Sequence, residues 1–174
     1  MEFIFVSGRR CVGRNIASVV EKARMIKGAK IVSFRVGAGR IFASFREDEA
    51  CRRTLPLFDG AAVFEGKLHT TCDSMPSPEM PIHARGSFCQ IRSERSSLYV
   101  ERDAYGMYPI WSLAQDGLRI VSNNVHLIAA VSQRILGSSL KKNADHLANI
   151  LGVGHGLFGS SLYENVELLD VGFR

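Results

Sequence analysis

The sequence has no long apolar run, and this absence argues against a membrane-spanning helix. A helix needs about 20 mainly apolar residues to cross a bilayer, and no stretch of the 174 residues approaches that length. The segment from Met1 to Gly8 contains an acidic residue and too short an apolar stretch for a secretory signal peptide. We therefore expect a cytoplasmic protein with no membrane partner.

Closely spaced cysteines are also missing. No two of the four cysteines are near each other in sequence: Cys11, Cys51, Cys72 and Cys89. The five histidines are scattered as well, so neither residue type shows the spacing of a zinc site. Disulfide frameworks are typical of much shorter secreted chains. We expect free buried thiols, no metal and no cofactor.

No nucleic-acid recognition motif accompanies the basic residues. The net charge of +5 could favour phosphate contacts. However, the arginines are interleaved with acids, as in Arg92-Ser93-Glu94-Arg95, which is more typical of a solvated surface. We therefore expect no nucleic-acid partner.

A complete phosphate loop is absent too. The glycine-rich run from Gly152 to Gly156 is similar to one, but a phosphate loop precedes its helix and ends in Gly-Lys-Ser or Gly-Lys-Thr. This run follows a predicted helix and has no lysine. The pattern favours a connector between elements.

The first half of the sequence shows the alternation of strands and the period of a helix. Its predicted elements are a buried strand over 3–6, a helix over 16–26 stopped by Gly28, a hairpin of strands 32–36 and 41–45, and a strand over 61–64. The hairpin loop is predicted as the three residues Gly37-Ala38-Gly39. A turn at Asp59-Gly60 is predicted to lead into the strand over 61–64.

The second half contains mainly hairpins. Its predicted strands are 88–91 paired with 98–100, 109–113 joined through Gln115-Asp116-Gly117 to 118–122, and a final extended segment over 162–169. Two helices are predicted over 125–131, capped by Asn123 or Asn124, and over 144–151, ended by Gly152. Many hairpin-connected strands with few helices indicate an α+β fold in a single domain, 1–174.

The order of residues after position 85 is more specific than this pattern. The ordered set is Gly86-Ser87-Phe88, Arg102-Asp103, Gly106, Pro109-Ile110-Trp111, Ser122-Asn123 and Leu127-Ile128-Ala129-Ala130. It is followed by Leu151-Gly152, Leu162-Tyr163-Glu164-Asn165-Val166 and Leu168-Leu169-Asp170-Val171-Gly172. This order resembles the amino-terminal domain of asparagine synthetases and their relatives, with Gly-x-Phe, Arg-Asp-x-x-Gly-x-x-Pro-Leu-Tyr, a strand ending Ala-Ser or Ser-Glu, and Leu-Pro-Pro-Gly. The resemblance covers residues 86 to 174, and earlier residues match only in the order of elements.

The resemblance implies an Ntn-hydrolase-like fold, a four-layer αββα sandwich of two antiparallel sheets between helical layers. It also implies descent from class II glutamine amidotransferases. In active relatives the cysteine exposed by removal of Met attacks the glutamine amide, and its own α-amino group is the base. An Asn-Gly pair after a strand contributes to the oxyanion hole.

The sequence departs from this family at the residues that carry the chemistry. Glu2 stands in place of the nucleophilic cysteine. Glu65-Gly66 aligns with the Asn-Gly pair, and an anion there would oppose the developing oxyanion, where each lost donor alone costs about 3 kcal/mol. The Ser-Asp-x-Glu segment that holds the glutamine α-amino group is missing, and Asp73 is a poor substitute. No catalytic residue is therefore predicted, and Glu2, Glu65, Gly66 and His69 are the candidates for a vestigial pocket.

Three other readings of these residues remain open. Arg102 and Asp103 could be a catalytic pair, but in the family they form a structural turn with Gly106 and Pro109, in which the aspartate binds backbone amides. Glu65 and His69 could form a new acid–base pair, although no supporting group is evident. Cys11 could serve as a relocated nucleophile, although a packed thiol is the simpler interpretation.

The function predicted from this resemblance is a degenerate amidotransferase-like domain of an amide- or lactam-forming enzyme, with glutaminase activity lost. The pyrophosphate loop Ser-Gly-Gly-x-Asp-Ser is absent, so the ATP-binding synthetase domain is not in this chain. We expect such a domain or subunit as the partner. The alternatives are a binding or regulatory module that holds an amino acid or peptide in the vacated pocket and, less favoured, an active glutaminase.

Overall fold

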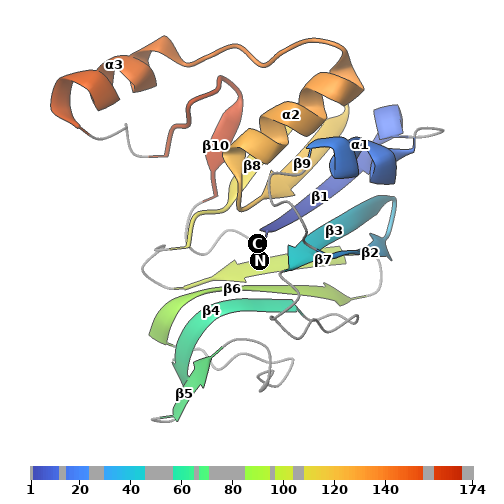
Figure 1. The fold of residues 1–174 in the computed structure, drawn as a ribbon, viewed down its shortest axis with the longest axis vertical. Helices are drawn as coiled ribbons and strands as arrows, with labels where there is room; N and C mark the ends of the chain where they lie inside the picture. Colours follow the sequence, from blue (N-terminus) through green and yellow to red (C-terminus); the bar gives the residue numbers. More distant parts are fainter. Residues whose placement is uncertain are drawn as a thin grey trace.

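The computed structural model describes residues 2–11, 15–23, 30–45, 57–64, 67–70, 85–94, 97–103, 108–154 and 159–169. Within these ranges the chain forms ten strands, three α-helices and one turn of 3-10 helix (Figure 1). The strands are β1 (Glu2–Gly8), β2 (Lys30–Val36), β3 (Gly39–Phe45), β4 (Leu57–Phe64), β5 (Lys67–Thr70), β6 (Arg85–Glu94), β7 (Ser97–Arg102), β8 (Trp111–Gln115), β9 (Leu118–Ser122) and β10 (Val166–Leu168). The helices are η1 (Arg9–Cys11), α1 (Ile16–Ala23), α2 (Val125–Leu136) and α3 (Ala144–Val153).

The larger sheet has six strands in the order β10-β8-β9-β1-β3-β2. Each neighbouring pair is antiparallel. The first strand of the chain therefore lies near the middle of the sheet, between a hairpin from the amino-terminal part (β2–β3) and a hairpin from the second half (β8–β9). The smaller sheet has four antiparallel strands in the order β5-β4-β6-β7.

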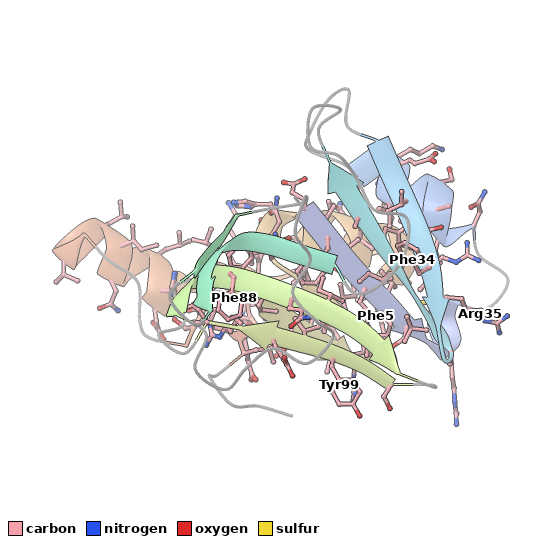
Figure 2. The ribbon with its side chains drawn as sticks, turned by 90° about the horizontal axis from the view of Figure 1, so that it is seen from below. Phe5, Phe34, Arg35, Phe88 and Tyr99 are labelled. Carbon is pink, nitrogen blue, oxygen red and sulfur yellow. The ribbon has the colours of Figure 1, made fainter. Side chains whose placement is uncertain are left out.

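The two sheets face each other across an apolar layer, so the predicted pair of antiparallel sheets is confirmed. Buried residues of both sheets, with one residue just before β8, form this layer: Phe3, Val36, Ile41, Ala43, Cys89, Ile91 and Ile110. Because side chains alternate along a strand, Ile4 and Phe42, which follow Phe3 and Ile41 in sequence, point to the other face of the larger sheet. Phe5 of β1 and Phe34 of β2 (Figure 2) are partly buried and pack against this layer.

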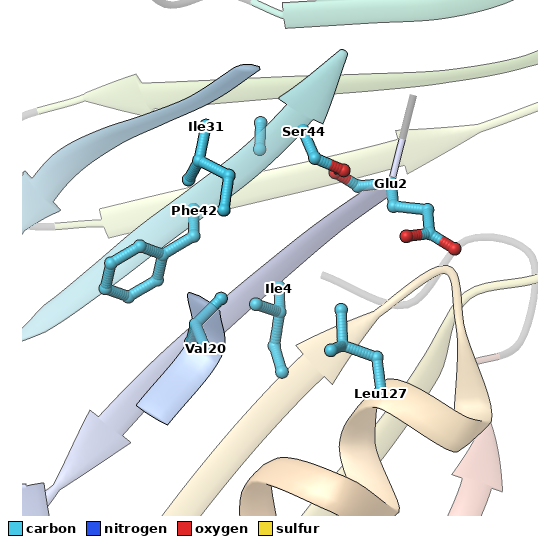
Figure 3. A pocket seen from close by; sticks show the side chains of 8 residues that line it. Glu2, Ile4, Val20, Ile31, Phe42, Ser44 and Leu127 are labelled. Atoms are coloured by element: carbon cyan, nitrogen blue, oxygen red, sulfur yellow. The ribbon is translucent and has the colours of Figure 1, made fainter. Parts of the chain in front are cut away.

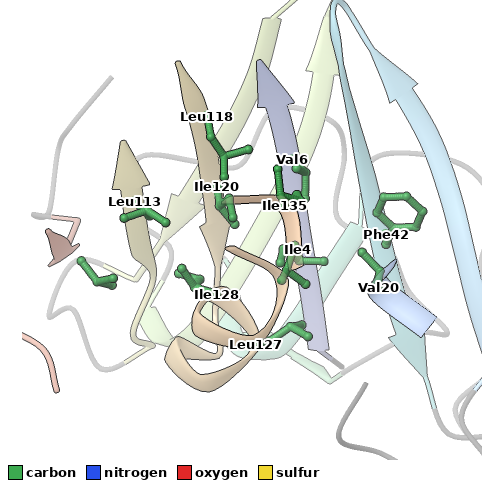
Figure 4. Packing of buried hydrophobic residues seen from close by; sticks show 12 residues of the cluster. Ile4, Val6, Val20, Phe42, Leu113, Leu118, Ile120, Leu127, Ile128 and Ile135 are labelled. Carbon is green, nitrogen blue, oxygen red and sulfur yellow. The ribbon is translucent and has the colours of Figure 1, made fainter. Parts of the chain in front are cut away.

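A second apolar layer lies between the six-stranded sheet and the helices α1 and α2 (Figure 4). Its buried residues are Ile4, Val6, Val20, Phe42, Leu113, Leu118, Ile120, Leu127, Ile128, Val131, Ile135 and Val166. In α2 the buried positions Leu127, Ile128, Val131 and Ile135 follow the 3–4 spacing of one helix face. The described residues thus form three layers: helices, larger sheet and smaller sheet.

The fourth layer of the predicted sandwich is not found among the described residues, where no helix covers the far face of the four-stranded sheet (Figure 1). One observation bears on that face. Phe88 and Gln90 alternate with Cys89 and Ile91 of the intersheet layer, yet both are buried, with 4% and 0% of their surface exposed. Strand β6 is therefore buried on both faces over residues 88–91, the part whose burial the structure describes.

Turn chemistry explains the hairpin that was predicted most accurately. Asp116 and Gly117 join β8 to β9, and both have positive φ, at 51° and 72°. This is the conformation of a type I′ turn, which aspartate and glycine favour and whose twist suits a two-residue hairpin. The paired strands predicted around residues 88–91 and 98–100 are also confirmed, since Ile91 pairs with Val100.

Two predicted turns differ from the structure. Asp59 and Gly60 lie inside β4, where they pair with Cys89 and Phe88 of β6, because pairing along the whole strand overrides the local turn preference. The loop between β2 and β3 contains two residues, not three, because Val36 pairs directly with Gly39. Gly37 accommodates this tighter loop with a φ of 54°.

The predicted helices exist, but their ends differ. The first helix is described from Ile16 to Ala23, and the rest of its predicted range with Gly28 lies outside the described residues. Helix α2 continues to Leu136, beyond the predicted end, because Gly137 is the first residue with left-handed backbone, at φ 81°. Helix α3 likewise ends at Gly154 rather than Gly152.

Within the described ranges, no helix is both long enough and apolar enough to cross a membrane.

Candidate functional site

Glu2 begins the central strand of the larger sheet, next to the amino-terminal end of α2. Ile4 and Val6 of β1 pack in the layer beneath the helices, so the alternation of the strand places Glu2 on the same side. Its carboxylate oxygen Oε1 accepts a hydrogen bond from the Asn124 side-chain amide at 2.8 Å. The half-buried glutamate is therefore tied to the helix that covers its sheet.

Asn124 links this glutamate to the start of α2. Its side-chain oxygen accepts hydrogen bonds from the backbone amides of His126, at 2.9 Å, and Leu127, at 3.2 Å. This is the geometry of an N-cap, which stabilises a helix by satisfying its first free amides. The negative charge of Glu2 also lies near the positive end of the helix dipole, where it is stabilising. The position expected to carry a nucleophile thus has a structural contact.

The backbone at Phe3 is held by the same segment. Its amide donates to the side-chain oxygen of Asn123 at 3.0 Å, and its carbonyl accepts from the Ser122 hydroxyl at 2.5 Å. The Ser122 hydroxyl also accepts a hydrogen bond from the backbone amide of Asn124 at 3.0 Å. Because Ser122 is fully buried, this network fixes the start of β1 against the end of β9.

The network continues to the predicted turn at Arg102 and Asp103. Asn123 donates through its side-chain amide to the Tyr108 hydroxyl at 3.1 Å. The Tyr108 backbone amide donates to the buried Asp103 carboxylate at 2.8 Å. This is the kind of backbone contact that the family resemblance predicts for the aspartate.

Of the other three residues predicted for this turn, the structure describes Arg102 and Pro109. Arg102 ends β7 and is half-buried, and Pro109 is exposed just before β8. Gly106 lies outside the described residues.

A small apolar cavity lies beside Glu2 (Figure 3). Its lining residues come from β1, β2, β3, α1 and α2: Glu2, Ile4, Val20, Ile31, Phe42, Ala43, Ser44 and Leu127. The accessible volume is about 20 Å³, little more than a cavity needs to hold one water. This cavity is too small for an amino acid.

Of the remaining vestigial-pocket residues, the structure describes only the backbone of His69. Glu65 and Gly66 lie outside the described residues. His69 is on β5, the edge strand of the smaller sheet, where its backbone pairs with Ala62, and its side chain is not among those described. Glu2 and His69 thus belong to different sheets.

A larger and more polar pocket lies at the other end of β1. Its lining residues are Val6, Cys11, Asn15, Ile16, Arg35, Ala38, Gly39 and Arg40, and its accessible volume is about 240 Å³. Arg35 and Arg40 were not predicted as site residues. The three-residue loop predicted for this hairpin gives the wrong register, whereas the observed two-residue loop sets them directly opposite each other.

The relocated nucleophile considered for this chain can also be placed. Cys11 lies in η1, beyond the far end of β1 from Glu2, and its thiol is partly buried in this polar pocket. Strands rise about 3.4 Å per residue, so β1 alone separates the two positions by roughly 20 Å. Among the described residues, no group of three or more His, Cys, Asp or Glu side chains could hold a metal ion.

No protein-family model and no curated protein matches the sequence. The resemblance to amidotransferase domains therefore rests on the order of residues between Gly86 and Gly172.

Proposed function

We propose that this chain is a degenerate class II glutamine amidotransferase-like domain that no longer hydrolyses glutamine. It would act in the cytoplasm beside an ATP-dependent synthetase domain or subunit that forms an amide or lactam. The proposal is supported by two facing antiparallel sheets, a helical layer on one of them and the central position of β1. The ordered residues from Gly86 onward supply the link to this family.

The contact of Glu2 with Asn124 carries the proposal of lost activity. A glutamine amidotransferase of this class needs a thiolate at this position, with a base and an oxyanion hole beside it. Here the side chain is a carboxylate that is hydrogen bonded to the cap of α2, and the adjoining cavity has room for about one water. The partly buried thiol of Cys11 lies beyond the opposite end of the strand.

The full four-layer Ntn-hydrolase sandwich is part of this proposal. The burial of Phe88 and Gln90 supports it, because these side chains point away from the intersheet layer and are still shielded from solvent. A sheet covered on both faces is expected for such a sandwich.

An ammonia-release assay tests the loss of activity. The purified chain is incubated with glutamine, and the expected result is no ammonia above a protein-free control. Cys11→Ala serves as the matched variant and should give the same result. Ammonia release that Cys11→Ala abolishes would overturn the proposal in favour of a glutaminase with a relocated nucleophile.

Co-purification from the native cells tests the partnership. The expected companion is a protein that hydrolyses ATP to activate a carboxylate, recovered with the wild-type chain. Recovery of the chain alone, at native abundance and low salt, would instead favour a free-standing binding module. The polar 240 Å³ pocket is the observation that supports this second function.

A further inference from the structure

Two arginines lie directly opposite each other on neighbouring strands. Arg35 of β2 pairs with Arg40 of β3 next to the two-residue loop. Their neighbours Phe34, Val36 and Ile41 pack in the layer between the sheets, so the alternation of both strands sends Arg35 and Arg40 to the opposite face. Figure 2 shows Arg35 and Phe34 as successive residues of β2, with Arg35 at the outside of the molecule.

This pairing is electrostatically unfavourable in the absence of an anion. Directly opposed residues of an antiparallel pair have Cβ atoms about 5 Å apart, and like charges at such positions destabilise the sheet. Both side chains are exposed, and within the described ranges neither guanidinium has an ion pair or a hydrogen bond. The local charge of two arginines is therefore not neutralised by the described part of the protein.

The same two arginines line the 240 Å³ pocket, together with Asn15, Cys11 and the start of α1. None of the lining residues that the structure describes is acidic. The first turn of α1 also has no acidic residue, so the positive end of its helix dipole adds to the charge of the arginines. The pocket is thus polar, about 240 Å³ in volume, and positively charged at its described residues.

We propose that this pocket binds a small molecule that carries a phosphate monoester, with Arg35 and Arg40 as its ligands. An arginine guanidinium binds phosphate oxygens through paired N–H donors. A phosphate monoester carries a charge of about −1.5 to −2 at neutral pH, which two guanidinium groups balance, whereas a single carboxylate balances one. The volume lies just below the range of about 300–1,000 Å³ for drug-sized ligands, so the ligand is a small phosphorylated metabolite.

Calorimetric titration with phosphoserine tests this site. Serine and succinate serve as matched probes, since the first lacks the phosphate and the second carries two carboxylates instead. We expect phosphoserine to bind and both other probes to bind at least about tenfold more weakly, as a lost charged hydrogen bond predicts. Binding should weaken as salt is raised.

Four variants assign the binding to the pocket. Arg35→Gln and Arg40→Gln should each weaken phosphoserine binding about tenfold, and the double variant should abolish it. Replacing both arginines by lysine keeps the positive charge but removes the paired N–H donors of the guanidinium groups, and it should give an intermediate affinity. Arg119→Gln is the control, because Arg119 is exposed on β9 of the same sheet while its neighbours Leu118 and Ile120 face the helices. It should leave the affinity unchanged.

Three results would overturn the assignment. They are absence of phosphoserine binding at millimolar concentration, equal binding of succinate, and equal weakening by Arg119→Gln. Circular dichroism of each variant ensures that a loss of binding is read only on folded protein. The glutamine assay is independent of all these outcomes, so failure here leaves the proposed loss of glutaminase activity intact.

Discussion

A pocket lies at each end of β1, on the face of the larger sheet that the helices cover. The two pockets differ in packing and in the balance of charge. At the first end, the Glu2 carboxylate has a hydrogen-bond partner in Asn124, and the adjoining cavity measures about 20 Å³. At the other end, Arg35 and Arg40 face each other beside a pocket of about 240 Å³. The Glu2 end is therefore closely packed and its charge has a partner, whereas the arginine end has an open polar pocket and two opposed positive charges.

The largest effect on stability is expected from removing buried side-chain volume at the Glu2 end of β1. Ile4 is 1% exposed and lines the small cavity, so Ile4→Ala should lower the free energy of unfolding by about 2–5 kcal/mol, as buried large-to-small changes do. Urea unfolding measures the loss. Ile31→Ala is the matched control, because Ile31 lines the same cavity on the edge strand β2 and is only partly buried. A larger loss for Ile31→Ala would show that this end is not packed as described.

The next effect concerns the cap that holds Glu2. Asn124→Ala removes the acceptor of two helix amides and the donor to Glu2, and it should cost about 1–2 kcal/mol of unfolding free energy. Asn124→Ser keeps a capping oxygen without the amide donor and should retain most of the stability. The difference between the two variants isolates the cap from the contact with Glu2. Equal losses would mean that the contact with Glu2 carries the whole effect.

A smaller effect of opposite sign is expected at the arginine end. In the absence of ligand, replacing both Arg35 and Arg40 by glutamine removes a repulsion between exposed charges, so stability should stay the same or rise by about 0.5 kcal/mol at low salt. The gain should vanish at high salt. Thermal unfolding at two salt concentrations measures it, with Arg119→Gln as the reference. A clear loss of stability of the double variant at low salt would contradict the inference that the two arginine charges repel each other.

An exposed ion pair away from β1, between Lys141 and Glu164, shows how little a surface charge pair is expected to change stability. The effects at the two ends of β1 can be compared with it. The Glu164 carboxylate accepts a hydrogen bond from Lys141 at 2.7 Å and raises the pKa of Lys141 above its ordinary value of 10.5, through that bond and the opposite charge. A raised lysine pKa contributes stability below pH 10.5, and the contribution disappears as the pH rises through the folded-state pKa. Since Lys141 is exposed, Lys141→Gln should leave the melting temperature at neutral pH unchanged. A drop of several degrees would show that surface charges matter more here than at the arginine pair.

Much of the fold could be predicted because its signals are local. The Asp116-Gly117 turn, the Asn124 cap and the alternation in β6 and β7 each depend on a few adjacent residues. The ends of α2 and α3 were less predictable, since a helix continues until the backbone reaches a residue that takes up left-handed conformation. Asp59-Gly60 has turn chemistry, but strand pairing with β6 decided its conformation.

The candidate sites were predicted only in part. The sequence pointed to Glu2 through the family resemblance, yet its partner Asn124 is 122 positions away and no local pattern connects them. Arg35 and Arg40 become a pair only through the exact register of β2 and β3. A one-residue change in loop length would send one of them to the other face of the sheet, since side chains alternate.

The sequence by itself determined most of the strands, the existence of the three helices and the Asp116-Gly117 turn, because hydrophobic period, capping residues and positive-φ residues act over a few positions. It also determined that position 2 carries a carboxylate. Only the tertiary structure decided that β1 lies between two distant hairpins, that Glu2 binds the cap of α2, and that two arginines share one pocket. These features depend on contacts between segments far apart in the chain, whose free energy comes from burial and pairing across the sheets.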